Sequence, residues 1–255
     1  KTSSMAWWVV VTGASHGIGE ALVRRLMHCG ANLYLLARSE PELQELCREA
    51  RAMGCHASYR CVDLRDRLAL NSVCSDLAKT LSSVDFLFCN AGKSICRRLV
   101  DATDRLHDFD RTMDLNYRSM VALSLTLLPA LRRTGGQLVY TSSVSSLYPP
   151  APKWSAYHAS KCASNVWCRT AACEWHSLGI GVHVAYLPLV RTPMSQVNPN
   201  YHALPAYSAH DAAGILLRLA LSNRFAYKPW WAWVTAPVAS FLAPFVRFFY
   251  QKAAR

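Results

Sequence analysis

The sequence predicts an α/β protein with a doubly wound parallel sheet that is covered by helices on both faces. Short apolar runs suited to buried strands alternate along the chain with stretches of helical periodicity, which is typical of βαβ units. A length of 255 residues provides enough apolar material for one large core. We therefore expect residues 1–255 to form one domain.

The first strand is expected at Trp7–Thr12, a continuously apolar run that suits a strand buried on both faces. The helix after it carries Ile18, Leu22 and Leu26 on one face. Further strands are expected at 31–37, 59–62, 85–89, 137–141 and 181–187.

A second helix is expected from Pro41 to about Met53, because Ser39 and Glu42 form a capping-box pattern at its start. Beyond the last of these strands, residues 188–209 are loop-like, and the pattern of residues 212–221 predicts another helix.

The positive charge of the chain is concentrated in its second half. Residues 1–115 hold 15 Lys and Arg against 14 Asp and Glu, whereas residues 116–255 hold 13 against 2. Such asymmetry favours an acidic partner, which could be a phosphorylated cofactor, an acyl-CoA or carrier protein, or an anionic membrane. A solvated basic face is the alternative. No recognition motif accompanies the charge, so we expect no nucleic-acid partner.

The ten cysteines form no C-x-x-C pair and no cluster with histidine at metal-ligand spacing. Several lie inside apolar runs, where a free thiol behaves as a small hydrophobic group. This usage predicts reduced thiols in a cytoplasmic protein without a metal site.

A glycine-rich turn, T-G-A-S-H-G-I-G at residues 12–19, connects the first strand to the first helix. Gly13 would permit the tight turn, Gly17 would let the backbone approach a phosphate, and Gly19 would let the helix pack closely on the sheet. The amides at the start of the helix would then bind a pyrophosphate. The turn predicts a Rossmann-type dinucleotide site.

Arg38 ends the second strand, in the string L-L-A-R-S-E. An acidic residue at this point would bind the 2′-hydroxyl of an adenosine ribose, whereas arginine suits a 2′-phosphate. The sequence therefore favours NADPH/NADP+ over NAD(H), although Glu40 lies close enough to complicate the choice.

The glycine turn and five further motifs, in this order, resemble those of the short-chain dehydrogenase/reductase family, and the resemblance covers about residues 7–194. They are the glycine turn, C-V-D-L around Asp63, C-N-A-G with Asn90, Ala91 and Gly92, then Asn116 in M-D-L-N-Y and Ser143 in Y-T-S-S-V, and Tyr157 four residues before Lys161. The resemblance implies a cofactor site assembled from the glycine turn and the ends of the strands. Its expected members are Gly13, Ser15, His16, Gly17, Ile18, Gly19, Arg38, Asp63, Leu64, Asn90, Ala91, Gly92, Tyr157, Lys161, Pro188, Val190 and Thr192.

The resemblance also implies roles for single residues of that cofactor site. Asp63 would contact the adenine, and Thr192 would lie near the carboxamide of the nicotinamide.

The catalytic set that the resemblance implies is Asn116, Ser143, Tyr157 and Lys161. Hydride transfer to a carbonyl carbon builds negative charge on the oxygen, which then needs a proton. Tyr157 would donate it, and Lys161, one helical turn away, would lower the pKa of the phenol and hold the nicotinamide ribose. Ser143 would bind the substrate oxygen, and Asn116 would position a water molecule.

The serine of this set is not fixed by spacing alone. Tyr157 follows Ser143 by one residue more than is usual in the family, and the usual spacing falls on Val144, which has no hydroxyl. An insertion in the proline-rich loop explains the difference most simply. Ser142 and Ser145 remain the alternatives.

Two strings are locally similar to the reductase module of bacterial fatty acyl-CoA reductases. They are P-L-V-R-T-P-M at 188–194 and H-D-F-D-R-T-M-D-L-N-Y at 107–117. The similarity implies a small-molecule carbonyl substrate, expected to be a lipid-like long-chain acyl thioester or aldehyde. A 3-keto reductase or hydroxysteroid-type dehydrogenase is the alternative, followed by a non-catalytic NADP(H)-binding scaffold.

Residues 190–255 are expected to form a substrate loop and a hydrophobic C-terminal extension. Residues 230–246 carry no charge, contain Pro237 and Pro244, and are followed by three basic residues. Aromatic and basic residues in this arrangement suit contact with a membrane surface or a lipid substrate. Packing against the core or a sister subunit is the alternative, and a membrane span is less favoured. We expect a homo-oligomer, located in the cytoplasm or peripherally on a membrane.

Overall fold

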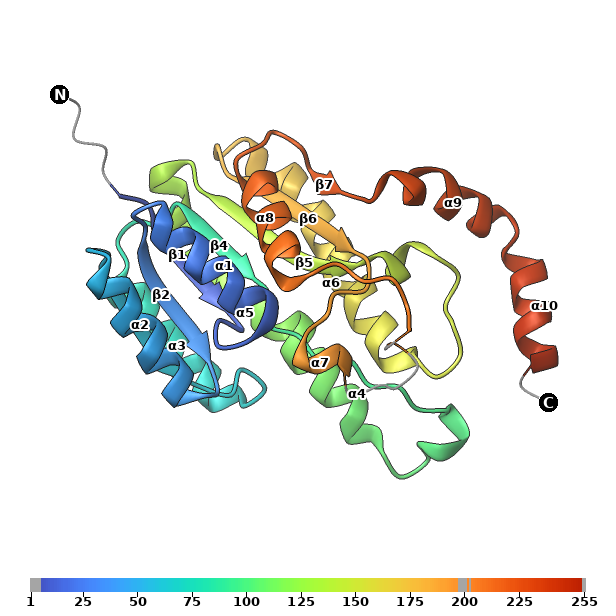
Figure 1. Cartoon of the computed structure of the whole chain (residues 1–255). Helices are drawn as coiled ribbons and strands as arrows, with labels where there is room; N and C mark the ends of the chain where they lie inside the picture. The colour runs from blue at the N-terminus through green and yellow to red at the C-terminus, as the bar shows by residue number, and fades with distance from the viewer. Residues whose placement is uncertain (1–5, 197–200, 202, 254–255) are drawn as a thin grey trace.

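A computed structural model describes residues 6–196, 201 and 203–253, whose strands form one parallel sheet of seven (Figure 1). The strand order is β3-β2-β1-β4-β5-β6-β7, so β1 and β4 are neighbours at the point where the order reverses, and the chain builds one edge and then the other. The strands are β1 (Trp8–Thr12), β2 (Asn32–Ala37), β3 (Ala57–Cys61), β4 (Phe86–Cys89), β5 (Gln137–Ser143), β6 (Gly181–Leu187) and β7 (Ala226–Tyr227).

Helices cover both faces of this sheet and extend beyond it at the C-terminal end. They are α1 (Gly17–His28), α2 (Glu40–Ala52), α3 (Arg67–Thr80), α4 (Leu106–Met113), α5 (Ser119–Thr134), α6 (Ser155–His176), α7 (Pro193–Gln196), α8 (Ala209–Ala220), α9 (Trp230–Phe241) and α10 (Ala243–Ala253). The described residues also include the short helical turns η1 (Leu99–Asp101), η2 (Asp114–Arg118) and η3 (Val144–Leu147).

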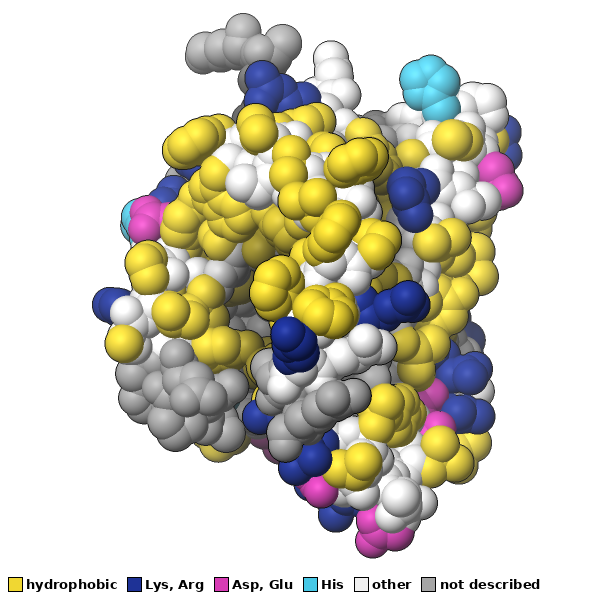
Figure 2. Space-filling model, turned by 90° about the vertical axis from the view of Figure 1, so that its right-hand side faces the viewer, with side chains coloured by type: hydrophobic (Ala, Val, Ile, Leu, Met, Phe, Trp, Pro, Cys, Tyr) yellow, Lys and Arg dark blue, Asp and Glu magenta, His cyan; other side chains and the backbone are white. Residues whose placement is uncertain are grey.

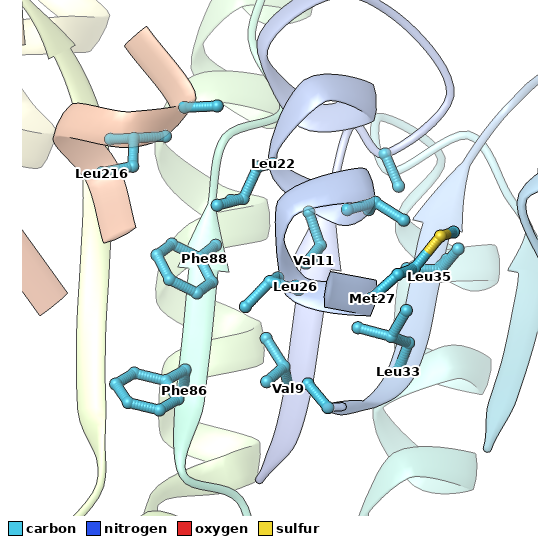
Figure 3. Close-up of a cluster of buried hydrophobic side chains, with 14 of the residues drawn as sticks. Val9, Val11, Leu22, Leu26, Met27, Leu33, Leu35, Phe86, Phe88 and Leu216 are labelled. Atoms are coloured by element: carbon cyan, nitrogen blue, oxygen red, sulfur yellow. The ribbon is translucent and has the colours of Figure 1, made fainter. Parts of the chain in front are cut away.

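The strand residues divide by the period of two that a pleated strand imposes. Val9 and Val11 of β1 enter one cluster of buried residues, together with α1, α2 and α8, and Val10 enters the other, together with α3, α5 and α6. Figure 3 shows the first cluster, where Leu22 of α1 and Leu216 of α8 lie over the same face of the sheet. Both faces of the sheet are therefore covered, as the apolar runs predict.

The predicted strands are confirmed with shifts of a few residues, and four local features differ. β3 begins at Ala57, two residues before its predicted start, and the two-residue β7 was not predicted. Ser39 does cap α2, but its side chain makes no capping hydrogen bond. Pro237 lies inside α9 instead of ending it.

Candidate active site

The glycine turn after β1 is tightly packed against the loop that follows β4. Gly13 has φ +66°, in the left-handed region, and a Cβ there would lie 2.9 Å from the Cα of Ala91. A Cβ at Gly19 would overlap the carbonyl oxygen of Gly13, so only glycine lets α1 start this close to the turn. Both positions serve the roles that the sequence predicts for them.

Gly17 faces a different part of the chain. Its φ is +59°, and a Cβ there would lie 3.0 Å from the Cγ2 atom of Thr192. The loop after β6 thus reaches back over the phosphate turn. Thr192 is fixed there by Ser195, whose hydroxyl accepts a hydrogen bond from the Thr192 amide at 3.0 Å.

The other expected members of this loop and turn are mostly packed in the protein. Val190 lies in the core, and Pro188 is half-buried just after β6. Ser15 is buried, with its hydroxyl 2.9 Å from Nδ1 of His16, and Ile18 packs partly against the core. His16 caps α1 without a side-chain hydrogen bond. The first amides of α1 are therefore not occupied by the cap, and an anion could accept hydrogen bonds from them.

Thr12 and Asn90 join β1 to the turn after β4. The Thr12 hydroxyl accepts hydrogen bonds from the amides of Asn90, at 3.0 Å, and Ala91, at 2.9 Å. The Asn90 amide group donates to the carbonyls of Thr12 and Gly13, both at 3.4 Å. Asn90 therefore acts here as a brace for the cofactor turn, and Thr12, which we did not single out, is its main partner.

The carboxyl ends of β2 and β3 carry two arginines. Arg38 is exposed, and its charge helps to lower the pKa of Asp63. The larger cause of that lowering is Arg65, which holds the Asp63 carboxylate through its guanidinium and its amide. Arg65 was missed because it follows the strand by several residues and belongs to no motif. Leu64, between these two, is buried in the core.

Tyr157 lies half-buried in the first turn of α6, with its hydroxyl beside Ser143 at the end of β5. Burial raises the pKa of Tyr157 to about 12, and the bond to Ser143 acts in the opposite direction. Ser145 extends this chain, since its hydroxyl lies 2.9 Å from that of Ser143.

Ser142, the other serine that the spacing allows, points elsewhere. It is buried and donates a hydrogen bond of 2.7 Å to the side chain of Asn165 on α6. Ser143 therefore lies beside Tyr157, whereas the Ser142 side chain helps to hold α6 against the sheet.

Lys161 is buried one helical turn after Tyr157. We expected it to act on the Tyr157 phenol, but its nearest contacts are with residues of β5. Its ammonium group donates to the carbonyl of Thr141 at 2.8 Å and lies 4.7 Å from the ring centroid of Tyr140. The centroid of Tyr157 is 5.9 Å away. Burial lowers the pKa of Lys161 to about 7. The expected lowering of the Tyr157 pKa is therefore not seen, because burial dominates at both groups.

Asn116 is fully buried in η2, a π-helical turn between α4 and α5. Its side chain donates to the Lys93 carbonyl and to the Ser160 hydroxyl, both at 2.9 Å, and accepts from the Lys93 amide at 2.8 Å. Its own carbonyl accepts from Ser164 of α6 at 2.9 Å. π-Helical turns are frequent at functional sites, and this one ties η2 to the helix of Tyr157.

Tyr140 and Gly92 complete the surroundings of Lys161. The Tyr140 hydroxyl is 3.4 Å from the carbonyl of Asn116. A Cβ at Gly92 would lie 3.6 Å from the Lys161 nitrogen and 3.4 Å from the Asn116 amide oxygen, so Gly92 leaves space beside both. Tyr140 lies inside the predicted Y-T-S-S-V motif and was overlooked, because a tyrosine in a buried strand gives no signal beyond packing.

The four predicted catalytic residues therefore lie around the carboxyl ends of β4 and β5, and the glycine turn borders the same edge through β1. In a parallel sheet this edge, at the point where strand order reverses, is where ligands bind. A half-buried tyrosine beside a serine and a buried lysine can supply a proton to an oxygen that gains charge.

Comparisons with known proteins agree with this arrangement. Residues 7–203 match the family described as short chain dehydrogenase. A fatty acyl-CoA reductase from Acinetobacter baylyi is 38% identical over 209 residues, which are 82% of this chain and 70% of that protein. An uncharacterized oxidoreductase from Mycobacterium tuberculosis is 35% identical over 213 residues, and the chain spans 62% of its length.

A solved structure shows the same fold with a cofactor bound. It is a putative NAD(P)-dependent gluconate 5-dehydrogenase from Beutenbergia cavernae, with NADP, and superposes with a TM-score of 0.77 at 27% identity. The match covers 86% of this chain and 91% of the other.

Proposed function

Because this chain belongs to the short-chain dehydrogenase family of oxidoreductases, we propose that it reduces a carbonyl group with NADPH, and that the carbonyl belongs to a long-chain fatty acyl thioester or aldehyde. The observation that carries the proposal is the half-buried Tyr157, which lies beside Ser143 and one helical turn from the buried Lys161. This group stands at the same sheet edge as the glycine turn.

The residues around the turn fit a phosphorylated dinucleotide. The first amides of α1 are free of a side-chain cap, Thr192 closes over Gly17, and Arg38 stands exposed at the adenosine end. Arg38 would bind the 2′-phosphate, while Asp63 is held by Arg65 beside it. NADPH, when bound, supplies the hydride for the carbonyl carbon.

Tyr157 holds the proton that the carbonyl oxygen needs. A pKa of about 12 keeps the phenol protonated at neutral pH, and an oxygen that becomes an alkoxide is a stronger base than the phenolate left behind. Ser143 orients the phenol and would donate to the substrate oxygen. Lys161, with a pKa of about 7, can take up or release a proton at neutral pH and so restore the phenol.

The long-chain substrate is supported by the relative from Acinetobacter baylyi, whose name gives fatty acyl-CoA as its substrate. A lipid-like substrate also agrees with the aromatic C-terminal extension and with the basic second half of the chain. We place the enzyme in the cytoplasm, with contact to a membrane surface. We also propose a homo-oligomer, because Leu125 on α5 and Val166 on α6 are exposed apolar residues that a second copy could cover.

The test follows NADPH absorbance with a panel of acyl-CoA thioesters, aldehydes and ketones of several chain lengths. We expect turnover to favour long acyl chains. Tyr157→Phe should lower kcat by about 10²–10⁴-fold and leave NADPH binding intact, because only the hydroxyl is removed. Turnover of ketones alone would assign the enzyme to the 3-keto or hydroxysteroid class. An absence of turnover with every substrate, unchanged in the variant, would point to a scaffold.

The two serines give a matched pair for the same assay. Ser143→Ala should lower kcat by about 10²-fold or more, because the partner of the Tyr157 hydroxyl and of the substrate oxygen is lost. Ser142→Ala should lower mainly stability, by about 1 kcal/mol, because its hydrogen bond to Asn165 is structural. The reverse result would show that Ser142 is the catalytic serine.

Arg38 tests the choice of cofactor separately. Arg38→Ala should weaken NADPH binding by about 10–100-fold, because a charged hydrogen-bonding partner of the 2′-phosphate is removed, and should change NADH binding little. Equal loss for both cofactors would show that Arg38 does not read the 2′-phosphate.

A further inference from the structure

Helix α9 packs its small side chains inward and its large ones outward, and α10 after it has no buried residue in the part that the structure describes. Ala232 and Ala236, one helical turn apart, are the buried residues of α9, with 1% and 8% of their surface exposed. Trp230 and Phe241 at its two ends are 82% and 85% exposed. A helix of a globular protein normally turns its large apolar side chains toward the core.

We call the large exposed side chains of these helices the outward face. It consists of Trp230, Trp233, Val234, Val238, Phe241, Phe245, Phe248 and Phe249, each more than half exposed. Figure 2 shows hydrophobic side chains gathered over the side of the molecule that carries α9 and α10, with Lys and Arg between them. A contiguous apolar surface of this kind marks a site of interaction.

The charges around the outward face have one sign. Lys228 precedes α9, and Arg247 and Lys252 lie on α10. Asp211 is the last acidic residue of the sequence, so residues 212–253 contain none. Exposed aromatic rings flanked by basic residues match the interfacial region of an anionic membrane.

The shape of the pair suits a position in the plane of a bilayer. Among the described residues, no single helix has the length and hydropathy of a membrane span, whereas α9 and α10 reach them only together, across a bend of 77°. Twelve residues of α9 extend about 18 Å, against a hydrocarbon core of about 30 Å. A bent pair whose exposed side is mainly apolar, with basic residues beside it, can instead lie at the surface with the apolar side chains among the acyl chains.

We propose that the outward face of α9 and α10 docks the enzyme on an anionic lipid bilayer, with the aromatic side chains inserted and Lys228, Arg247 and Lys252 at the headgroups. The proposal deepens the function given above and rests on it for the lipid-like substrate. A second copy of the chain fits the face less well, because self-association would bring the same basic residues together without acidic partners.

Docking of this face would bring the active-site loop to the membrane. The Tyr148 hydroxyl is 2.5 Å from the Thr235 hydroxyl of α9, and the rings of Tyr148 and Trp231 lie 6.5 Å apart. Tyr148 belongs to the loop between Ser143 and Tyr157. An acyl chain that leaves the bilayer would therefore meet the site beside the helix that docks.

The experiment is flotation of the full chain with phosphatidylcholine vesicles, prepared with and without phosphatidylserine. We expect flotation that is stronger with phosphatidylserine. The variant Phe241→Ser with Phe245→Ser should abolish it, and both positions are exposed, so the fold should be retained. The matched control is Leu68→Ser with Leu106→Ser, which changes two equally exposed leucines on α3 and α4 and should float like the wild type.

Charge reversal tests the basic residues. Arg247→Glu with Lys252→Glu should weaken binding to the phosphatidylserine vesicles by at least about 25-fold, since each basic residue near such a surface contributes about five-fold. Flotation requires no turnover, so it can succeed or fail independently of the proposed reaction.

Three results would overturn the proposal. The first is the absence of flotation with either vesicle. The second is resistance of the bound protein to alkaline carbonate extraction, which would indicate a span. The third is a smaller oligomeric mass for Phe241→Ser with Phe245→Ser in the absence of vesicles, which would show that a second copy covers the outward face.

Discussion

Helices α1 and α9 have the same length, 12 residues, and opposite packing. α1 buries Leu22, Val23, Leu26 and Met27, and it ends with Arg25 and His28 in its last turn. α9 buries two alanines. Its tryptophans and Phe241 point away from the protein or lie at its edge.

The difference shows that hydrophobic content alone does not place a helix in a core. Burial of a large apolar side chain stabilises a fold by about 1.5–3 kcal/mol. The large side chains of α1 make this contribution, whereas the exposed ones of α9 do not. α9 keeps most of its apolar surface available for a partner. The body of the enzyme and its C-terminal extension should therefore respond differently to the same kind of substitution.

The largest contrast is expected for stability. Leu26→Ala on α1 should lower the free energy of unfolding by about 2–5 kcal/mol, because Leu26 has no exposed surface and its removal leaves a cavity. Phe241→Ala on α9 should change it by less than about 0.5 kcal/mol. Urea denaturation of both variants measures the difference. Equal losses would mean that Phe241 is buried in solution.

The next largest effect is on the pH dependence of stability, and it comes from the buried Lys161. The pKa of Lys161 is about 7 in the folded protein against an ordinary 10.5, so the unfolded chain binds more protons between these values. Wild-type stability should therefore gain a few kcal/mol from this group, as an order of magnitude, as the pH rises from 7 to 10.5.

Lys161→Met lacks this gain. Relative to the wild type, the variant should be most stable below pH 7 and should lose that advantage steadily up to pH 10.5. Denaturation of both proteins across this range is the measurement. A difference that does not change with pH would show that Lys161 titrates alike in the folded and unfolded states.

The smallest effect concerns the attachment of α9 to the body. Thr235→Val removes the hydrogen bond to Tyr148 and should lower the local stability of α9 by about 1 kcal/mol. Faster hydrogen exchange of the α9 amides, with unchanged exchange in α1, is the expected result. Tyr148→Phe removes the same bond from the other side, so the two substitutions combined should have no additional effect.

Much of the fold could be predicted because its signals are local. The apolar runs of β1 and β6 are long enough to identify a buried strand, and the glycine turn fixes where α1 begins. β7 could not be predicted, since two residues form no pattern and only pairing with β6 defines the strand. Residues 230–241 were not predicted as a helix because proline usually interrupts one, yet α9 contains Pro237.

Site residues that belong to a motif could be predicted from the sequence. Residues that join the site only through tertiary packing could not. The sequence left three serines open; in the structure Ser143 lies beside the Tyr157 hydroxyl, and Ser142 donates a hydrogen bond to Asn165. Arg65 lies two residues after Asp63 but belongs to no motif, and Tyr140 reaches Lys161 only through the packing of α6 on the sheet, so neither was identified. The pKa directions of Tyr157 and Lys161 likewise follow from burial, which spacing does not reveal.

Helix α8 is synthesised late, yet it covers part of the central sheet. After β1, β2 and β3, each later strand adds to one growing edge in the order in which it is made. The apolar face that carries Phe86 and Phe88 is covered in part by α8, which packs on α1, β5 and β6 and contributes Leu216. A nascent chain must therefore emerge to about residue 220 before that face is closed, and until then it is open to chaperones and to aggregation.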